Sequence, residues 1–256
     1  MSAPVLEIRD VTLAFGKVFA VDRVSLDVRQ EEILGLIGPN GAGKTSLLNL
    51  VSGLYRPHSG KIVFAGQDIT SLPPHARARL GIGRTFQGGR AYLGMTVVEN
   101  ILAGMHTRLR SGAVVGFMRW PWGYKEELLA RRVAEEIIDF LDLEPYRERV
   151  VGELGFGLRK RVDLGRALAL APKLLLLDEP MAGMSIDEKE DMCRFILDIR
   201  EFLKIPIVLV EHDMEVVMDL CDRIVVMDLG RVISEGPPEV VRRDPAVISA
   251  YLGVTA

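Results

Sequence analysis

The N-terminal part of the chain alternates apolar and polar residues, a pattern typical of half-buried β-strands. The alternation runs through VLEIRDVTLAFG, residues 5–16, and VDRVSLDVRQEEILGLIG, residues 21–38. It predicts strands of an antiparallel sheet with one face in the core. Within the second stretch, Leu34 to Ile37 forms a short apolar strand that ends in a glycine-rich turn. A helix is expected to follow from about Lys44 to Ser52.

Three continuous apolar runs occur later in the chain, at Leu174–Leu177, Ile207–Val210 and Ile224–Met227. Runs without alternation suit parallel strands that are covered on both faces. Helical patterns lie between them, near residues 158–170 and 186–203. Strands that alternate with helices predict an α/β fold.

The middle of the chain has a different pattern. Lys125–Leu143 carries apolar residues at helical spacing with charged residues between them, namely Leu128, Leu129, Val133, Ile137, Ile138 and Leu141. We therefore expect residues 88–157 to form a helical subdomain inserted into one domain that spans residues 1–256. The core of that domain would comprise residues 1–87 and 158–240, with a C-terminal tail at 241–256.

Composition narrows the possible classes of protein. Hydrophobic residues make up 48% of the 256 residues, which is enough for a sizeable core. The formal net charge of −3 gives no reason to expect a nucleic-acid partner. The N-terminus does not have the pattern of a signal peptide, and no apolar run approaches the ~20 residues that span a bilayer. We therefore expect any action at a membrane to depend on a partner.

The strongest motif is GPNGAGKT, which consists of Gly38, Pro39, Asn40, Gly41, Ala42, Gly43, Lys44 and Thr45. It follows an apolar strand and opens a helix, as a phosphate-binding loop requires. Glycines let backbone N–H groups curl around phosphate oxygens, and the helix N-terminus adds positive potential. Lys44 is expected to reach the β- and γ-phosphates, and the Thr45 hydroxyl to bind Mg²⁺. Ser46 follows in the first helical turn.

Acidic and histidine residues follow two of the apolar runs. LLLLDEP places Asp178 and Glu179 at the end of a strand, where open α/β sheets bind ligands. Asp178 suits a magnesium ion, usually through water, and Glu179 suits the polarisation of an attacking water. His212, in EHD after the IVLV run, is expected to contact the γ-phosphate or that water.

These elements, in this order, resemble an ABC-transporter ATPase over nearly the whole chain. The resemblance implies an α/β fold with a P-loop NTPase core, an antiparallel β subdomain and an inserted helical subdomain. It also implies that Phe15 in VTLAFG stacks on adenine. Gln87 in GRTFQ would link Mg²⁺ and the γ-phosphate to the helical subdomain. AGMSID, residues 182–187, would face an opposite ATPase subunit.

RTFQ, the long insertion, the AGM loop and the ending DPAVISAYLG resemble ATPases of branched-chain amino-acid uptake systems. The resemblance implies hydrolysis of ATP with Mg²⁺ and pairing with a second ATPase subunit. Integral-membrane permeases would hold the pair at the cytoplasmic face of the membrane, and a periplasmic binding protein would select the cargo. Related systems import urea, amides or aromatic acids, so the transported molecule stays open.

The segment LGFGL, residues 154–158, departs from the family's LSGGQ turn, which binds the γ-phosphate of the opposite subunit. Gly155 replaces the serine and Leu158 the glutamine, while Gly157 still permits a close backbone approach. We expect Gly155 and Gly157 to contribute a weakened phosphate contact. RKR, residues 159–161, is expected to form a solvated helix face.

Two assemblies remain open at this stage. In a heterodimer, one site would combine this chain's phosphate loop with a complete partner turn, and the other site would be weak. A homodimer would carry two weakened sites. A P-loop kinase would need an acceptor pocket and lid arginines, and the DEP, AGMSID and EHD series has no obvious place in it. A non-transport ABC protein of DNA repair or the ribosome is disfavoured because the chain has no coiled coil, second cassette or basic stripe.

Overall fold

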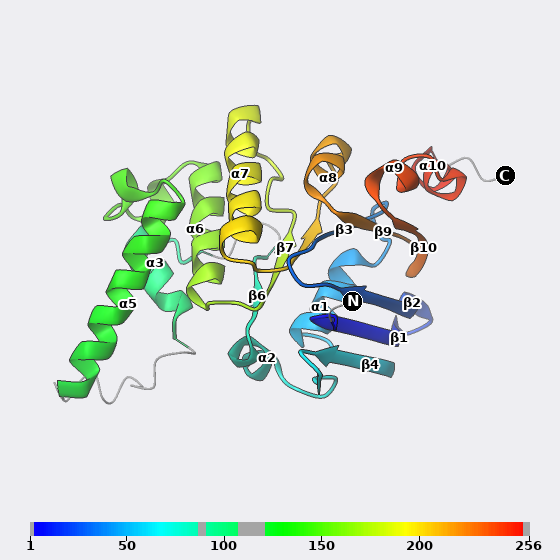
Figure 1. Ribbon diagram of the computed structural model, residues 1–256, viewed down its shortest axis with the longest axis horizontal. Coiled ribbons are helices and arrows are strands. Elements are labelled where there is room, and N and C mark those ends of the chain that lie inside the picture. Colours follow the sequence, from blue (N-terminus) through cyan, green and yellow to red (C-terminus); the bar gives the residue numbers. More distant parts are fainter. Residues whose placement is uncertain (1–2, 87–90, 107–120, 253–256) are drawn as a thin grey trace.

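The computed structural model describes residues 3–86, 91–106 and 121–252 of the chain, and Figure 1 shows how their elements are arranged. Two sheets carry the fold. The first is antiparallel with strand order β2-β1-β4-β5, where β1 is Leu6–Phe15, β2 is Val18–Val28, β4 is Ser59–Phe64 and β5 is Gln67–Asp68. The alternating burial along β1 confirms the predicted half-buried strands.

The second sheet has strand order β10-β9-β3-β8-β7-β6. Its strands are β10 Arg231–Gly236, β9 Arg223–Asp228, β3 Ile33–Ile37, β8 Ile207–Val210, β7 Leu174–Asp178 and β6 Ile82–Arg84. All neighbours pair in parallel except β10, which is antiparallel to β9. The three apolar runs are therefore parallel strands, as predicted, and they are buried along their length.

Helices cover this second sheet and extend beyond it (Figure 1). Their bounds are α1 Lys44–Ser52, α2 Pro74–Leu80, α3 Val97–Gly104, α5 Pro121–Phe140, α6 Phe156–Ala169, α7 Ile186–Phe202, α8 Met214–Leu220, α9 Pro238–Val241 and α10 Pro245–Leu252. Two 3₁₀ turns, η1 Glu144–Tyr146 and η2 Val151–Glu153, connect α5 to α6. The helix predicted from Lys125 thus begins earlier, at Pro121, and ends at Phe140.

The helical part is built on α3 and α5, against which α6 packs. Helix α3 begins with a capping box in which Thr96 and Glu99 satisfy each other's backbone N–H groups. Because α6 packs against both α3 and the core strand β6, it joins the helical part to the second sheet. The division of the chain at residues 87 and 88 and at 157 and 158 stays a proposal, and the first of these boundaries lies outside the described residues.

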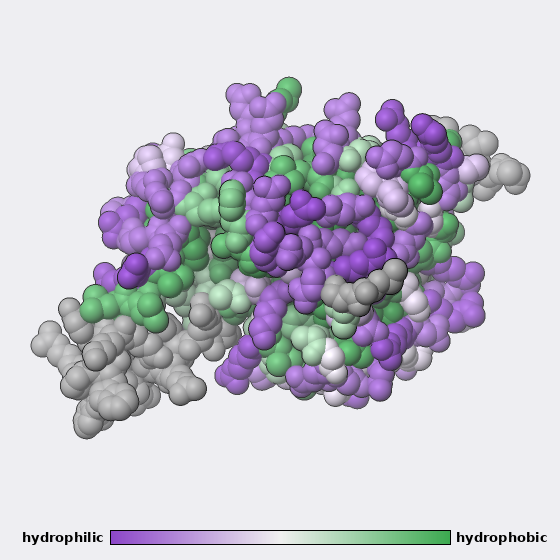
Figure 2. Space-filling model, in the orientation of Figure 1, coloured by the Kyte–Doolittle hydropathy of each residue, from purple (hydrophilic) through white to green (hydrophobic). Residues whose placement is uncertain are grey.

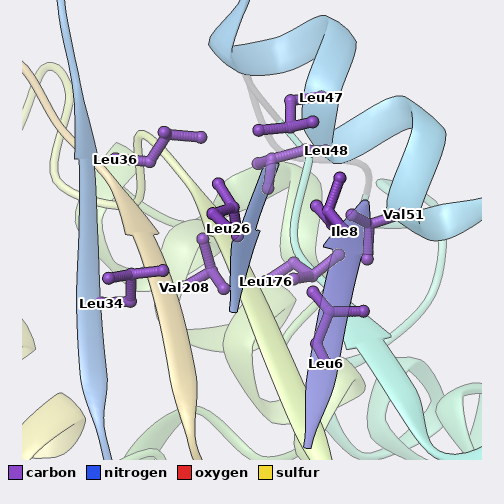
Figure 3. Close-up of a pocket in the computed structure, with 10 residues that line it drawn as sticks. All are labelled: Leu6, Ile8, Leu26, Leu34, Leu36, Leu47, Leu48, Val51, Leu176 and Val208. Carbon is purple, nitrogen blue, oxygen red and sulfur yellow. The ribbon is translucent and has the colours of Figure 1, made fainter. Parts of the chain in front are cut away.

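A tight apolar layer holds the two sheets together around α1. Figure 3 shows a cavity of about 10 Å³ in this layer, lined by side chains of both sheets and of α1. Its lining is aliphatic throughout: Leu6, Ile8, Leu26, Leu34, Leu36, Leu47, Leu48, Val51, Leu176 and Val208. A space of about one water volume without polar partners stays dry. The cavity is therefore a small packing gap and not a binding site.

Arg77 of α2 forms hydrogen bonds with the C-terminal end of α1. Its buried guanidinium donates to the carbonyls of Leu50 and Val51, at 2.5 and 3.0 Å, and also to the carbonyls of Thr70 and Leu72. Burial lowers the pKa of Arg77 to about 10. The bonds to Leu50 and Val51 supply donors to carbonyls in the last turn of α1, and they fix the helix that follows the phosphate loop.

Polar and apolar side chains share the face of the molecule seen in Figure 2. Figure 2 shows hydrophilic side chains over α7 and α8 and apolar ones gathered in separate patches. Among the described residues, no helix is both long and apolar enough to cross a bilayer.

Candidate functional site

The phosphate loop lies between the C-terminal end of β3 and the start of α1. Gly38, Gly41 and Gly43 all have positive φ, at 146°, 85° and 103°. A Cβ on Gly38 would lie 2.0 Å from the Met227 carbonyl oxygen, and one on Gly43 would lie 2.2 Å from that of Ala20. Backbone segments of β9 and β2 therefore press on the loop, and only glycine fits at these two positions.

Other residues of the loop stabilise its curl. The Ala42 N–H donates to the Pro39 carbonyl at 3.1 Å, and the Gly230 N–H donates to the Ala42 carbonyl at 3.0 Å. Ala42 is buried, Asn40 and Gly41 are exposed, and Ser46 is half-buried in the first turn of α1. The rim of the loop is thus open to solvent while its base is anchored.

Lys44 folds back across the loop. Its side chain is buried, and Nζ donates to the carbonyls of Gly38 at 2.7 Å and Pro39 at 3.1 Å. Burial lowers the pKa of the Lys44 ammonium, and the carboxylates of Glu179 and Asp178 act in the opposite direction. The ammonium occupies the centre of the loop, where phosphate oxygens would replace the carbonyls as its partners.

Asp178 lies at the end of β7 beside the loop. Its Oδ1 is 3.5 Å from the Thr45 hydroxyl oxygen, and its Oδ2 accepts a bond from the Arg84 guanidinium at 3.0 Å. The carboxylate is buried, as an ion-paired group can be. Thr45 and Asp178, two of the three predicted magnesium ligands, are therefore neighbours.

Glu179 and His212 meet at the ends of the adjacent strands β7 and β8. His212 Nε2 lies 2.7 Å from Glu179 Oε1. Buried Glu211 supports this corner by accepting from the N–H groups of Met181, at 2.8 Å, and His212, at 3.3 Å. Burial raises the pKa of the Glu211 carboxyl, although both hydrogen bonds act in the opposite direction. Two residues selected from separate motifs thus form one hydrogen-bonded pair.

Phe15 lies at the end of β1, with its side chain about half exposed. Its ring meets that of Tyr55 edge to face, with centroids 5.3 Å apart. The exposed Phe15 ring offers a flat apolar face for stacking, and Tyr55 packs against it edge to face. Gln87, the remaining predicted residue of the site, lies outside the described residues.

Comparison with known proteins decides the family. Residues 21–182 match the ABC transporter family model, and residues 231–256 match a model of the branched-chain amino acid ATP-binding cassette transporter. The chain belongs to the ABC transporter ATP-binding proteins. The activity of this family, ATP hydrolysis that drives transport, therefore applies to it.

Individual relatives agree along the whole chain. The high-affinity branched-chain amino acid transport ATP-binding proteins BraF of Pseudomonas aeruginosa and LivG of Escherichia coli K12 are 38% and 37% identical over 253 residues, covering 99% of each chain. A solved nucleotide-free ATP-binding cassette from an ABC transporter is 33% identical with a TM-score of 0.86, covering 98% of this chain and all of that one. The predicted family, fold class and ATPase activity are confirmed.

The ABC signature turn, residues 154–158, begins α6. Gly155 is the N-cap residue, with φ −60° and ψ 162°, and no side chain caps the helix there. A Cβ on Gly155 would meet nothing within 4 Å. The turn also contacts α7 and the loop before it, since a Cβ on Gly157 would meet the Glu188 side chain of α7 and the Phe156 ring covers Gly183 of the loop. Gly155 is thus exposed at a free helix N-terminus.

The expectation that residues 159–161 form a solvated helix face is wrong. Lys160 and Arg161 are buried, and Arg159 is half-buried. Arg159 donates to the carbonyls of Gly152 and Leu154, while Lys160 donates to the carbonyl of Glu179. Arg161 pairs with Asp191 of α7. The helix face lies against α7 and the loop after β7, and the sequence pattern of three cations gave no sign of these partners.

Two further residues of the site were missed. Arg84 bonds Asp178 and also the Asn49 and Ser52 side chains of α1, so it links β6 to the phosphate-loop helix. Its place next to the family's TFQ stretch was the available signal. Tyr55, three residues beyond the end of α1, had no such signal because its position beside Phe15 depends on the packing of the first sheet against α1.

Proposed function

We propose that this chain is the ATP-hydrolysing subunit of an importer for branched-chain or related amino acids. The observation that carries the proposal is the meeting of the phosphate loop, Asp178, and the Glu179–His212 pair at the carboxyl ends of β3, β7 and β8. The full-length similarity to BraF and LivG supports the amino-acid cargo.

Lys44 and the loop amides would bind the β- and γ-phosphates, with the positive end of α1 behind them. Phe15 would stack on the adenine ring, with Tyr55 packed against the Phe15 ring. The loop residues Gly38, Pro39, Asn40, Gly41, Ala42, Gly43 and Ser46 complete the phosphate cradle. Binding thus uses backbone amides and one buried cation, which suits a triphosphate of any base; stacking adds the preference for a purine.

The oxygen donors of Thr45 and Asp178 fit Mg²⁺, which binds one or two protein ligands and completes its shell with phosphate oxygens and water. Among the described residues, no cluster of three or more His, Cys, Asp or Glu side chains could hold a metal by itself. The bound ion would neutralise charge on the phosphates. Gln87 is proposed as a further ligand from the family resemblance.

Glu179 would accept the proton of the attacking water, with its carboxylate directed by the bond to His212. When a γ-phosphate is bound, His212 would donate to the phosphate oxygen and stabilise the charge that develops there. Glu179 and His212 follow the ends of the neighbouring parallel strands β7 and β8, whose pairing up to Asp178 and Val210 brings the carboxylate and the ring together.

ABC cassettes dimerise and form complexes with permease subunits. For this chain we propose a heterodimer with a second ATPase whose signature turn is complete. The phosphate loop, Glu179 and His212 of this chain would then form the stronger site, and Gly155 and Gly157 would complete the weaker one. The pair would be attached to permeases at the cytoplasmic face of the membrane, and a periplasmic binding protein would deliver the cargo.

A cavity of about 300 Å³ between α2, β6, α3 and α6 is the proposed permease contact. Tyr92 lines it, and the Arg166 guanidinium lies 4.7 Å from the centre of its ring. Leu93 and Met95 are exposed nearby. Changing Tyr92 to Asp is expected to reduce transport while basal hydrolysis persists. Undiminished transport would count against this contact.

The proposed function is tested in vesicles that hold the complete transporter. ATP-dependent uptake of labelled leucine, isoleucine or valine is expected, with no uptake of urea. Lys44→Ala should lower nucleotide retention and uptake by about a hundredfold or more, because it removes the cation that binds the phosphates. Lys204→Ala, which changes an exposed lysine paired with Glu31, is the matched control. Retained turnover in Lys44→Ala would overturn the proposed site, whereas urea uptake would change the cargo alone.

A further inference from the structure

Lys160 connects the signature turn of this chain to its own hydrolytic carboxylate. The side chain leaves the second turn of α6, is only 5% exposed, and its Nζ donates to the Glu179 carbonyl at 2.9 Å. The Phe156 ring lies one helical turn earlier, with its centre 5.5 Å from Nζ. A buried ammonium bonded to a backbone carbonyl is a strong, charge-assisted contact.

The carbonyl that Lys160 holds belongs to a residue with unusual backbone geometry. Glu179 has φ of +51°, a left-handed conformation that residues with a side chain rarely adopt. Such a conformation persists only when neighbouring groups hold it. The Glu179 N–H donates to the Val210 carbonyl at 2.9 Å, so β8 fixes one side of the residue. Lys160 fixes the other side.

The same helix N-terminus also contacts the next part of the loop. The Phe156 ring would lie 3.1 Å from a Cβ on Gly183, whose φ is +79°, so the ring lies directly over this glycine. Met181, between the two contacts, is held by the Glu211 carboxylate. Residues 179–183 are therefore clamped between β8 with its following loop on one side and the first turns of α6 on the other.

Charges around Lys160 suit this role. Burial lowers the pKa of its ammonium, while the carboxylates of Asp163 and Glu211 act in the opposite direction, as do those of Glu179 and Asp178. The contact is therefore both a hydrogen bond and the cationic centre of an acidic corner. A side chain without a donor would leave the Glu179 carbonyl without this partner and would remove one positive charge from the corner.

We propose that Lys160 is a positioning residue for ATP hydrolysis: its bond to the Glu179 carbonyl holds that residue in the conformation in which the carboxylate meets His212. The inference rests on the proposed role of Glu179. It also concerns regulation, because the turn at the start of α6 would cover the nucleotide of the opposite subunit. A displacement of that turn would move Lys160, and with it the carboxylate of this chain's own site.

The test uses the complete transporter with four single variants of this chain and one double variant. Lys160→Met keeps the length of the side chain but removes the donor, and Lys160→Arg restores one. Arg161→Met is the matched control, since Arg161 is a buried cation of the same helix that pairs with Asp191 instead. Glu179→Gln reports on the carboxylate itself. Steady-state hydrolysis gives kcat and KM for ATP, and thermal unfolding gives the stability of each variant.

Lys160→Met is expected to lower kcat by about tenfold to a hundredfold, as misplacement of a catalytic group does, with KM within about threefold of the parent. Lys160→Arg should recover most of kcat, and Arg161→Met should change kcat little. Combined with Glu179→Gln, Lys160→Met should cause no further loss, because both changes act on one group.

A kcat for Lys160→Met within twofold of the parent would overturn the inference. So would an equal loss in Arg161→Met, or losses in the double variant that multiply. If Glu179→Gln itself keeps the parent's rate, the proposed catalytic role fails and the inference fails with it. A large loss in Glu179→Gln without one in Lys160→Met rejects the inference alone. If Lys160→Met does not fold, Lys160→Leu takes its place with the same expected loss, and a kcat within twofold of the parent again overturns the inference.

Discussion

The phosphate loop and the signature turn are both turns at a helix N-terminus that contain glycine. The structural requirement for glycine differs between them. Gly38 and Gly43 have positive φ, and backbone oxygens lie about 2 Å from where a Cβ would stand. Gly155 has φ of −60° and open space around it. The first turn needs glycine for its shape. The second does not, since the backbone at Gly155 would accept other residues.

The difference bears on the proposed heterodimer, in which the two turns would belong to different nucleotide sites. Its phosphate loop is complete, and its Glu179–His212 pair is in place. Its signature turn keeps a helix N-terminus with free N–H groups but offers no hydroxyl. A site built with this turn would lose a charge-assisted bond that is worth roughly 1.5–3 kcal/mol.

The largest expected effect comes from adding one methyl group to the crowded turn. In Gly43→Ala the Cβ would strike the Ala20 carbonyl oxygen in a conformation that alanine disfavours. We expect a loss of about 3 kcal/mol or more in the free energy of unfolding, together with loss of ATP binding. Chemical denaturation and nucleotide titration measure these.

Gly66→Ala is the control for conformation alone, since Gly66 has φ of +79° and open space around its Cβ position. It should cost only about 1 kcal/mol. Equal decreases in the free energy of unfolding for Gly43→Ala and Gly66→Ala would show that the close contact in the phosphate loop does not affect stability.

An intermediate effect is expected within the signature turn. The Cβ in Gly157→Ala would lie 2.2 Å from the Glu188 carboxylate oxygen, which closes a capping box with Ser185 at the start of α7. Because a side chain can move away, the cost should be about 1 kcal/mol, that of a lost cap.

The Glu188→Ala background distinguishes this cause from any other. There the capping box is already absent, and adding Gly157→Ala should cost less than half as much as in the parent. Denaturation of the two single variants and the double variant gives the coupling. Strictly additive losses would mean that Glu188 is not what opposes the methyl group.

The smallest effect on stability is expected at Gly155. Gly155→Ser supplies a helix cap without a clash, and it should raise the free energy of unfolding by a few tenths of a kcal/mol. In the assembled heteromer it should strengthen ATP binding at the composite site by about tenfold, since a hydroxyl is restored. Equilibrium binding to the complex measures this, with Gly155→Ala as the variant that adds a Cβ but no donor. An unchanged affinity in Gly155→Ser would remove the reason to call the site weakened.

Patterns in the sequence were sufficient for the local features of the site. Continuous apolar runs predicted β7, β8 and β9, and the helix predicted over 44–52 matches α1. The GPNGAGKT spacing placed Lys44 and Thr45, because a phosphate loop is formed by neighbouring residues whose geometry depends on glycine. The roles of Gln87 and of residues 88–157 as a unit stay predictions.

The surroundings of the site depended on segments far apart in the chain. Arg84 reaches Asp178 across 94 positions, and no periodicity links two such residues. The sequence predicted that Lys160 and Arg161 are exposed to solvent, because three adjacent cations are usually exposed. Their burial became visible only in the structure, where Arg161 pairs with Asp191 of α7.

The sequence by itself determined the chemistry of this protein: a backbone cradle, a lysine, two carboxylates and a histidine at strand ends. These follow from short-range rules of glycine conformation and strand burial. Only the tertiary structure decided how the carboxylate is held. The hydrogen bond from Lys160 to the Glu179 carbonyl and the close approach of β9 to Gly38 both join elements that meet only after folding. Such contacts cannot be predicted from local sequence patterns, because the pattern around each residue reflects only the helix or strand to which that residue belongs.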